Sequence, residues 1–291
     1  MSLLDRLRDL IEEPPPKFVF ELGPSGVAYW HANVGLRYEP GPGFGNAGEA
    51  AEVEVDTAGL TSVLQRIAPQ TNGNGKRHAA VILPDRCARV SILDFDSFPR
   101  KAEEQIDLIR FRLKRTLPFD VETAVLRYTA RSLGGNKQEL TVAAISVETL
   151  APFEMAFRNA GFHPGFVTLS GLSAANLAEP DSMTLRLGGH VLSLAHFEGS
   201  EMRLFRCLDL QEGSLDEVLN VLDPTLAYLE DERQKKPVRV DLCGFGGVTV
   251  GLAEHLWEQW RIAANEMESK LGKVQAYNAG LHGYLRAAGV S

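Results

Sequence analysis

The chain has 291 residues, 44% of them hydrophobic and 23% charged, which is enough to bury a core in one large domain or two moderate ones. Thirty basic against 38 acidic residues give a net charge of −8, which argues against a broad nucleic-acid-binding surface because phosphate binding requires clustered positive charge. Three widely spaced cysteines, Cys87, Cys207 and Cys243, form no CxxC pair, so the sequence indicates neither a disulfide framework nor a zinc site. These features favour a globular protein of the reducing cytoplasm.

Residues 1–16 predict a short amphipathic arm. Apolar side chains recur at helical spacing in "MSLLDRLRDLIEE", and three prolines then end the helix. Its polar side mixes acidic and basic residues, so its electrostatic attraction to anionic lipid would be weak. Docking on a protein surface is therefore favoured over membrane binding.

The following elements alternate between strands and helices. A strand, a tight turn and a second strand are predicted over residues 18–30, and a helix over residues 57–68. Residues 78–99 predict two strands joined by a turn at Asp85 and Arg86.

A helix follows over residues 100–117 and is ended by Pro118. One side of this helix is apolar and the other is basic, with Arg110, Arg112, Lys114 and Arg115. Two strands joined by "LGGNK" come next, and a helix over residues 148–160 ends at Gly161.

The remaining part of the chain predicts three strands within residues 184–210 and a further strand within residues 238–247. Helices are predicted over residues 215–233, 249–270 and 279–288. This alternation of strands and helices indicates an α/β fold.

Two hairpins separated by about half the chain look duplicated. In "FVFELGPSGVAYW" and "MTLRLGGHVLSLAHF" a strand ends in Leu-Gly, a turn of small residues follows, and a second strand returns. Glu21 then corresponds to Arg186, and a third glycine-rich turn, "GFGG", occupies residues 244–247. Glycine turns allow backbone amides to approach a phosphate closely, although each turn taken singly is also compatible with a plain hairpin or helix cap.

Order and spacing of these features resemble the PilM-like type IV pilus assembly proteins, members of the actin-like ATPase superfamily related to division and type II secretion proteins. The resemblance is strongest in residues 81–132, where a Pro-Asp turn, a strand ending in Phe-Pro, a basic helix and a Leu-Pro-Phe stop follow one another. It continues through "ISVETLAPFEMAFRNAGFHPGFVTLSGLSAANL".

The resemblance implies an actin-like (ribonuclease H-like) α/β fold of two duplicated halves, residues 17–170 and 171–291. A small α+β subdomain would be inserted at about residues 83–150, and the second half would be trimmed on the side that covers adenosine. It further implies a bacterial cytoplasmic scaffold that binds the N-terminal cytoplasmic tail of a bitopic, PilN-like inner-membrane protein. The chain would then reach the membrane only indirectly, and it could form homo-oligomers.

The nucleotide site that the resemblance implies departs from the family pattern at both strand ends. Glu21 stands where the family has an Asp that holds magnesium through water, and Arg186 reverses the charge at the second acidic position. We therefore expect a vestigial cleft that binds no cofactor or only weak ATP, with Glu21 and Arg186 within ~4 Å of each other as an ion pair. The residues expected around this cleft are Glu21, Gly23, Ser25, Gly26, Arg186, Gly188, Gly189, Gly244, Gly246 and Gly247.

Two other functions remain open from the sequence. An active ATPase or sugar-kinase-like phosphotransferase on the same fold would need a carboxylate base and a metal ligand, for which Glu21 is the visible candidate. A division-type relative that polymerises would contact the membrane through the N-terminal helix. The seven histidines lack metal-ligand spacing, and Ser25 and Ser170 do not match a nucleophile elbow.

Overall fold

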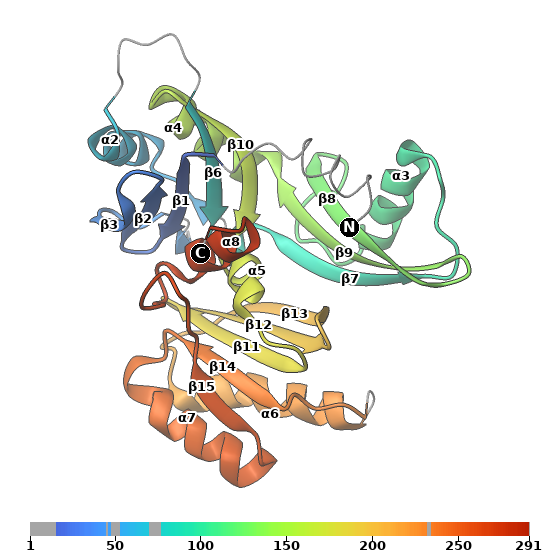
Figure 1. Ribbon diagram of the computed structural model, residues 1–291. Helices are drawn as coiled ribbons and strands as arrows, with labels where there is room; N and C mark the ends of the chain where they lie inside the picture. The colour runs from blue at the N-terminus through green and yellow to red at the C-terminus, as the bar shows by residue number, and fades with distance from the viewer. Residues whose placement is uncertain (1–15, 45, 48–52, 70–76, 232–233, 291) are drawn as a thin grey trace.

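The computed structural model describes residues 16–44, 46–47, 53–69, 77–231 and 234–290. The amphipathic arm predicted over residues 1–16 therefore lies outside the described residues, apart from Pro16. Two five-stranded sheets lie one above the other, and a smaller three-stranded sheet lies beside them (Figure 1).

The first sheet combines an antiparallel meander with two parallel strands. In spatial order it contains β10 (Phe162–Leu169), β6 (Arg77–Leu83), β1 (Phe18–Gly23), β2 (Gly26–His31) and β3 (Gly35–Pro40). Helices α2 (Thr57–Ile67) and α4 (Val147–Asn159) supply the apolar side chains that pack on one face of this sheet. A two-stranded ribbon, β4 (Asn46–Ala47) with β5 (Val53–Glu54), precedes α2.

The second sheet repeats this topology strand for strand. Its order is β13 (Glu201–Asp209), β12 (Val191–Glu198), β11 (Ser182–Gly188), β14 (Arg239–Cys243) and β15 (Ala263–Glu266). β11, β12 and β13 pair antiparallel, whereas β14 and β15 pair parallel, as β6 and β10 do in the first sheet. The predicted α/β fold of two duplicated halves is confirmed.

Equivalent positions of the two hairpins carry the two charged residues singled out in the sequence. Glu21 pairs with Ala28 in the first hairpin, two residues before the turn, and Arg186 pairs with Ser193 in the second. Because successive side chains of a strand point to opposite faces, Glu21 and Arg186 lie opposite the faces that carry the outer helices.

The small sheet is antiparallel and is covered by one helix. Its order is β7 (Arg89–Phe95), β9 (Lys137–Ser146) and β8 (Ala124–Gly134), and α3 (Ala102–Leu113) packs on one face. Ile109 and Leu113 of α3 are fully buried in this contact, against Leu140 and Val142 of β9. The sheet and its helix lie between β6 and α4 in the chain, as an insertion into the first half (Figure 1).

The outer face of the second sheet packs on α6 (Leu215–Asp231) and α7 (Thr249–His255). The single helix predicted over residues 249–270 is wrong. After α7 a π-helical turn, η4 (Leu256–Trp260), ends at Arg261 in the left-handed conformation, and the chain then forms β15. Parallel pairing with β14 decides the conformation of this stretch, whose "AANE" has no strand signal of its own. Trp257, in η4, is 56% exposed.

The C-terminal helix α8 (Ala279–Ala287) returns to the first half, although the sequence boundary assigns it to the second. Its Leu281 and Leu285 are buried on the face of the first sheet that carries Val19. Together with the short helix α5 (Ser170–Ala174), α8 lies between the two sheets (Figure 1).

Close approach of α5 and α8 requires glycine in α8. A Cβ at Gly283 would overlap the carbonyl oxygen of Ser173. Gly283→Ala should therefore lower the free energy of unfolding by about 1–3 kcal/mol, even after the roughly 1 kcal/mol that Ala gains over Gly in a helix. Gly247→Ala is the control, because a Cβ there meets no atom within 4 Å. Urea unfolding followed by circular dichroism measures both, and equal stabilities would contradict the packing of α8 on α5.

Candidate functional site

The inward-facing ends of β1 and β11 meet between the two halves. Arg186 Nη2 lies 3.6 Å from Glu21 Oε1, and the two side chains are 7% and 0% exposed. The ion pair expected from the sequence is therefore present, and it is buried.

Glu21 also accepts hydrogen bonds from the start of α8. The backbone N–H of Leu281 donates to Oε2 at 2.7 Å, and that of Gly280 donates to Oε1 at 3.3 Å. The Ser170 hydroxyl, at the start of α5, donates to Oε1 as well. A helix N-terminus attracts anions, and here the protein's own carboxylate takes that place.

Asp85 is a second buried carboxylate of this cluster, at the start of the 3₁₀ turn η1 (Asp85–Cys87) that follows β6. Its Oδ2 lies 3.3 Å from Arg186 Nη1 and accepts a 2.5 Å hydrogen bond from the Ser193 hydroxyl. Its Oδ1 accepts from the Gly171 backbone N–H at 2.6 Å. The sequence analysis predicted a turn at Asp85 but did not predict that Asp85 belongs to the site. The available signal was its position directly after a strand parallel to β1, because the carboxyl ends of parallel strands meet at one edge.

Arg186 thus joins two carboxylates that come from the first half. Its Nη2 also donates to the carbonyl oxygen of Ala276 at 2.5 Å. A Cβ at Gly188 would lie 2.7 Å from Nη1, so the glycine two residues after Arg186 leaves room for the guanidinium. Two negative charges and one positive charge are held together in a site that water does not reach.

Burial dominates the electrostatics of the cluster. Loss of hydration raises the pKa of Glu21, while the Arg186 charge and the donors on Ser170, Leu281 and Gly280 oppose that rise. The adjacent Cys243 thiol has its pKa raised to about 12, also by burial, so this cysteine is an inert core residue.

The two turns predicted to be phosphate loops touch each other. A Cβ added at Gly189 would lie 3.3 Å from Pro24 Cγ, so the tips of the first and second hairpins are in contact. Ser25 shares a 2.7 Å hydrogen bond with the Tyr38 hydroxyl and is exposed. Gly23 and Gly26 form the closing pair of the first hairpin, and Gly26 lies against the β3 backbone.

The third glycine turn lines a separate pocket. Gly244 and Gly246 border a cavity of about 230 Å³, whose rim includes Glu266 and Lys273. Ala276, the carbonyl partner of Arg186, also lines it, so the pocket adjoins the buried cluster. Gly247 is exposed beside this turn, at the start of η3 (Gly246–Val248). The cavity is smaller than the roughly 300–1,000 Å³ typical of small-molecule sites.

A magnesium ion does not fit between these carboxylates. A magnesium site needs oxygen ligands with free lone pairs, whereas the oxygens of Glu21 and Asp85 are engaged by protein donors and by Arg186. Among the described residues, no group of three or more His, Cys, Asp or Glu side chains is placed to hold a metal ion. The Arg186 guanidinium is the cation that both carboxylates already contact.

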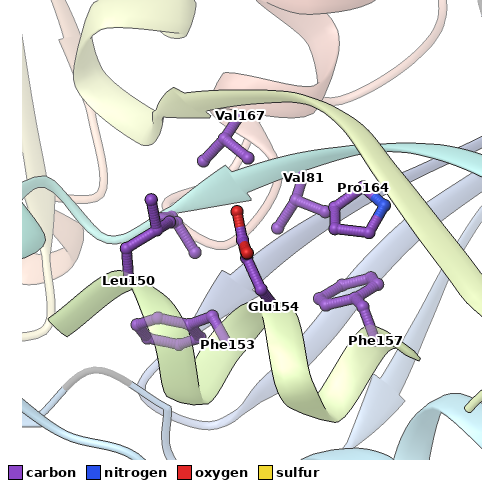
Figure 2. Close-up of a pocket in the computed structure, with 8 residues that line it drawn as sticks. Val81, Leu150, Phe153, Glu154, Phe157, Pro164 and Val167 are labelled. Carbon is purple, nitrogen blue, oxygen red and sulfur yellow. The ribbon is translucent and has the colours of Figure 1, made fainter. Parts of the chain in front are cut away.

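A second surface feature lies on the first half. A shallow apolar depression, too small to hold a water molecule, lies between α4 and β10 and is lined by Val81, by Leu150 and Phe153 from α4, and by Pro164 and Val167 from β10 (Figure 2). β10 is an edge strand of the first sheet.

β10 also exposes apolar side chains to solvent. Phe166 and Val167 are 48% and 38% exposed. Glu154 adds one carboxylate to the apolar lining (Figure 2), and Arg158 donates to it at 2.7 Å.

No family model matches the chain, and no curated protein matches it. Several solved structures do match the chain in fold. PilM in the "PilM-PilN type IV pilus biogenesis complex" is 19% identical with a TM-score of 0.67, covering 96% of this chain and 100% of that one. The cytoplasmic domain of EpsL, an inner membrane component of the type II secretion system of Vibrio cholerae, is 11% identical with a TM-score of 0.50, covering 94% of each chain.

These likenesses establish the fold. The chain has an actin-like fold similar to that of PilM, as the sequence resemblance predicted. Within the part of the chain that the structure describes, no helix is long and apolar enough to cross a membrane.

Arg186→Ala should be one of the most destabilising changes in the protein, because it leaves two buried carboxylates without their cation. The expected loss is about 3–5 kcal/mol in the free energy of unfolding, and it should be smaller in the double variant Glu21→Ala with Arg186→Ala. The loss in Arg186→Ala should grow as the pH rises above the ordinary pKa of a carboxyl group. Burial raises the pKa of Glu21, so this side chain folds protonated at low pH, and its ionisation in the buried site costs free energy as the pH rises.

Arg66→Ala provides the control for this comparison. Arg66 forms an exposed ion pair with Glu39, with side chains 54% and 34% exposed, and its loss should cost less than ~1 kcal/mol. Denaturant unfolding at several pH values measures all four proteins. An Arg186→Ala variant as stable as Arg66→Ala would show that the buried cluster does not hold the two halves together.

Proposed function

We propose that this chain is a cytoplasmic, non-catalytic scaffold of a type IV pilus or a related secretion or competence machine. It would bind the cytoplasmic tail of a bitopic inner-membrane protein and so be peripheral to that membrane. Full-length similarity in fold to PilM, solved in complex with PilN, supports this proposal, and so does similarity to the cytoplasmic part of a type II secretion protein.

The observation that carries the non-catalytic part of the proposal is the buried Arg186. Its guanidinium is bonded to Glu21, Asp85 and the Ala276 carbonyl in the space between the two halves. A nucleotide-dependent enzyme on this fold would need that space for phosphate and metal, and it would need a carboxylate with a free oxygen. We therefore assign Glu21 and Arg186 to a degenerate nucleotide site, with the surrounding glycine turns as its remnants.

The pocket beside Gly244 is the one observation that favours the alternative, a nucleotide-binding protein. Gly244, Gly246 and Thr249 line it together with the charged Glu266 and Lys273. Weak nucleotide binding without turnover is compatible with that pocket, because it adjoins the buried cluster and, among the described residues, no group of three or more His, Cys, Asp or Glu side chains is placed to hold a metal ion there.

The tail of the partner would bind at the border of the first sheet and the inserted subdomain. The apolar depression of Figure 2 lies there, because β9 of the insertion ends at Ser146 and α4, which forms one wall, begins at Val147. β10 forms the other wall and is an edge strand, to which an extended peptide can add by backbone hydrogen bonds. Phe166 and Val167 point to opposite faces of β10, so they offer apolar contacts to successive side chains of such a peptide.

A synthetic peptide from the N-terminal tail of a co-encoded single-span membrane protein should bind the purified chain. We expect micromolar affinity, about −8 kcal/mol, because ordering a flexible tail offsets much of the contact energy. Val167→Asp should weaken binding more than tenfold, since it places a charge on the apolar wall.

Val250→Asp is the matched control, because Val250 is 66% exposed on α7 of the other half and should leave the affinity unchanged. Isothermal titration calorimetry gives both values. Absence of heat with every co-encoded tail would remove the scaffold proposal, whereas equal weakening by both variants would remove only the proposed position of the tail.

A further inference from the structure

The end of α3 in the inserted subdomain carries an exposed aromatic ring among cations. Phe111 is 75% exposed, more than any other large hydrophobic side chain among the described residues. It lies two residues from each of the buried Ile109 and Leu113, and at about 100° per residue this spacing directs its ring away from the subdomain core. A ring in this position contributes nothing to folding and remains in contact with water.

Three exposed basic residues flank this ring. They are Arg112, Lys114 and Arg115, and with Phe111 they are called here the α3 patch. Between Leu108 and Phe119 the sequence contains four basic residues and no acidic one, in a chain whose net charge is −8. Basic residues in the last turn of a helix stabilise it through the helix dipole. This effect accounts for the basic residues at the end of α3, but it does not account for the exposed ring of Phe111.

The guanidinium of Arg112 is held at the edge of the α3 patch. It lies over the Phe95 ring at 5.2 Å, and its Nη1 donates to the Asp94 carbonyl at 3.4 Å. The fourth cation, Arg110, lies within 4 Å of acidic groups on Asp107 and Glu122 and is not part of the patch. The net positive charge of the patch therefore rests on Arg112, Lys114 and Arg115.

We infer that the α3 patch is a contact site for an anionic phospholipid surface. Because three-quarters of Phe111 is exposed, no protein groove encloses its ring. The pockets at α4–β10 and beside Gly244 are lined by residues of other elements. A peptide ligand would need such walls, whereas a lipid interface accepts a protruding ring into its headgroup layer and attracts the cations around it. Charge complementarity thus selects anionic lipid as the occupant.

This contact would orient the chain. Most of the protein is acidic and is repelled by an anionic leaflet, so the α3 patch marks the side that faces the bilayer. The patch lies on the same inserted subdomain that borders the apolar depression of Figure 2. The inference goes beyond the proposed function, because that function requires attachment to the membrane only through a partner.

The test uses the full chain and protein-free vesicles. Vesicles of phosphatidylglycerol mixed with phosphatidylcholine should bind the protein in a flotation assay, and vesicles of pure phosphatidylcholine should not. The double variant Lys114→Glu with Arg115→Glu should lower binding more than tenfold, and Phe111→Ser should lower it about fivefold. Circular dichroism checks that the variants are folded.

Two controls keep the result specific. Trp257→Ser removes another exposed aromatic side chain, on the second half, and should leave binding unchanged. Leu7→Asp with Leu10→Asp disrupts the apolar side of the N-terminal arm. Vesicle binding that is lost in this arm variant but kept in the double α3 variant overturns the inference, as does the absence of any binding to anionic vesicles. Because the vesicles carry no protein, neither outcome depends on whether the chain binds a partner tail.

Discussion

The buried guanidinium of Arg186 is the interaction on which the arrangement of the two halves depends. Three charges lie out of water between the halves, and such burial is costly unless every group is bonded. Here Glu21 and Asp85 compensate Arg186, and backbone amides of α5 and α8 donate to the carboxylate oxygens, while the Nε of Arg186 is buried without a hydrogen-bond partner. The cluster therefore joins strands and helices that are far apart in the chain, and removing its cation would leave two carboxylates unpaired.

Duplication of the fold explains why one residue has this effect. Each half ends its first strand in a hairpin, and each hairpin places its charged residue two positions before the turn, on the inward face. A second carboxylate opposite Glu21 would give an acidic cleft that attracts a metal ion and phosphates. An arginine there supplies the cation from within the protein, and the hairpin tips at Pro24 and Gly189 come into contact. This arrangement agrees with the non-catalytic scaffold that we propose.

Much of the fold and part of the site could be predicted from the sequence. The two hairpins were predicted from their strand patterns and from the glycine turns between the strands. The equivalence of Glu21 and Arg186 was predicted because each residue stands directly before a Leu-Gly pair. Asp85 and Ser170 were missed because their partners lie more than 80 residues away in the chain, and no local pattern marks such a contact. The strand β15 was missed for the same reason: its residues are compatible with a helix, and only pairing with β14 makes them a strand.

The most direct measurement of the central claim is magnesium-dependent ATP binding and hydrolysis by the purified wild-type chain. The account predicts no turnover above the rate without protein, and at most weak binding, because Glu21 and Asp85 are already engaged by Arg186. Glu21→Ala serves as the active-site control, since Glu21 is the carboxylate that an enzyme on this fold would use. Robust turnover by the wild type that Glu21→Ala abolishes would contradict the account.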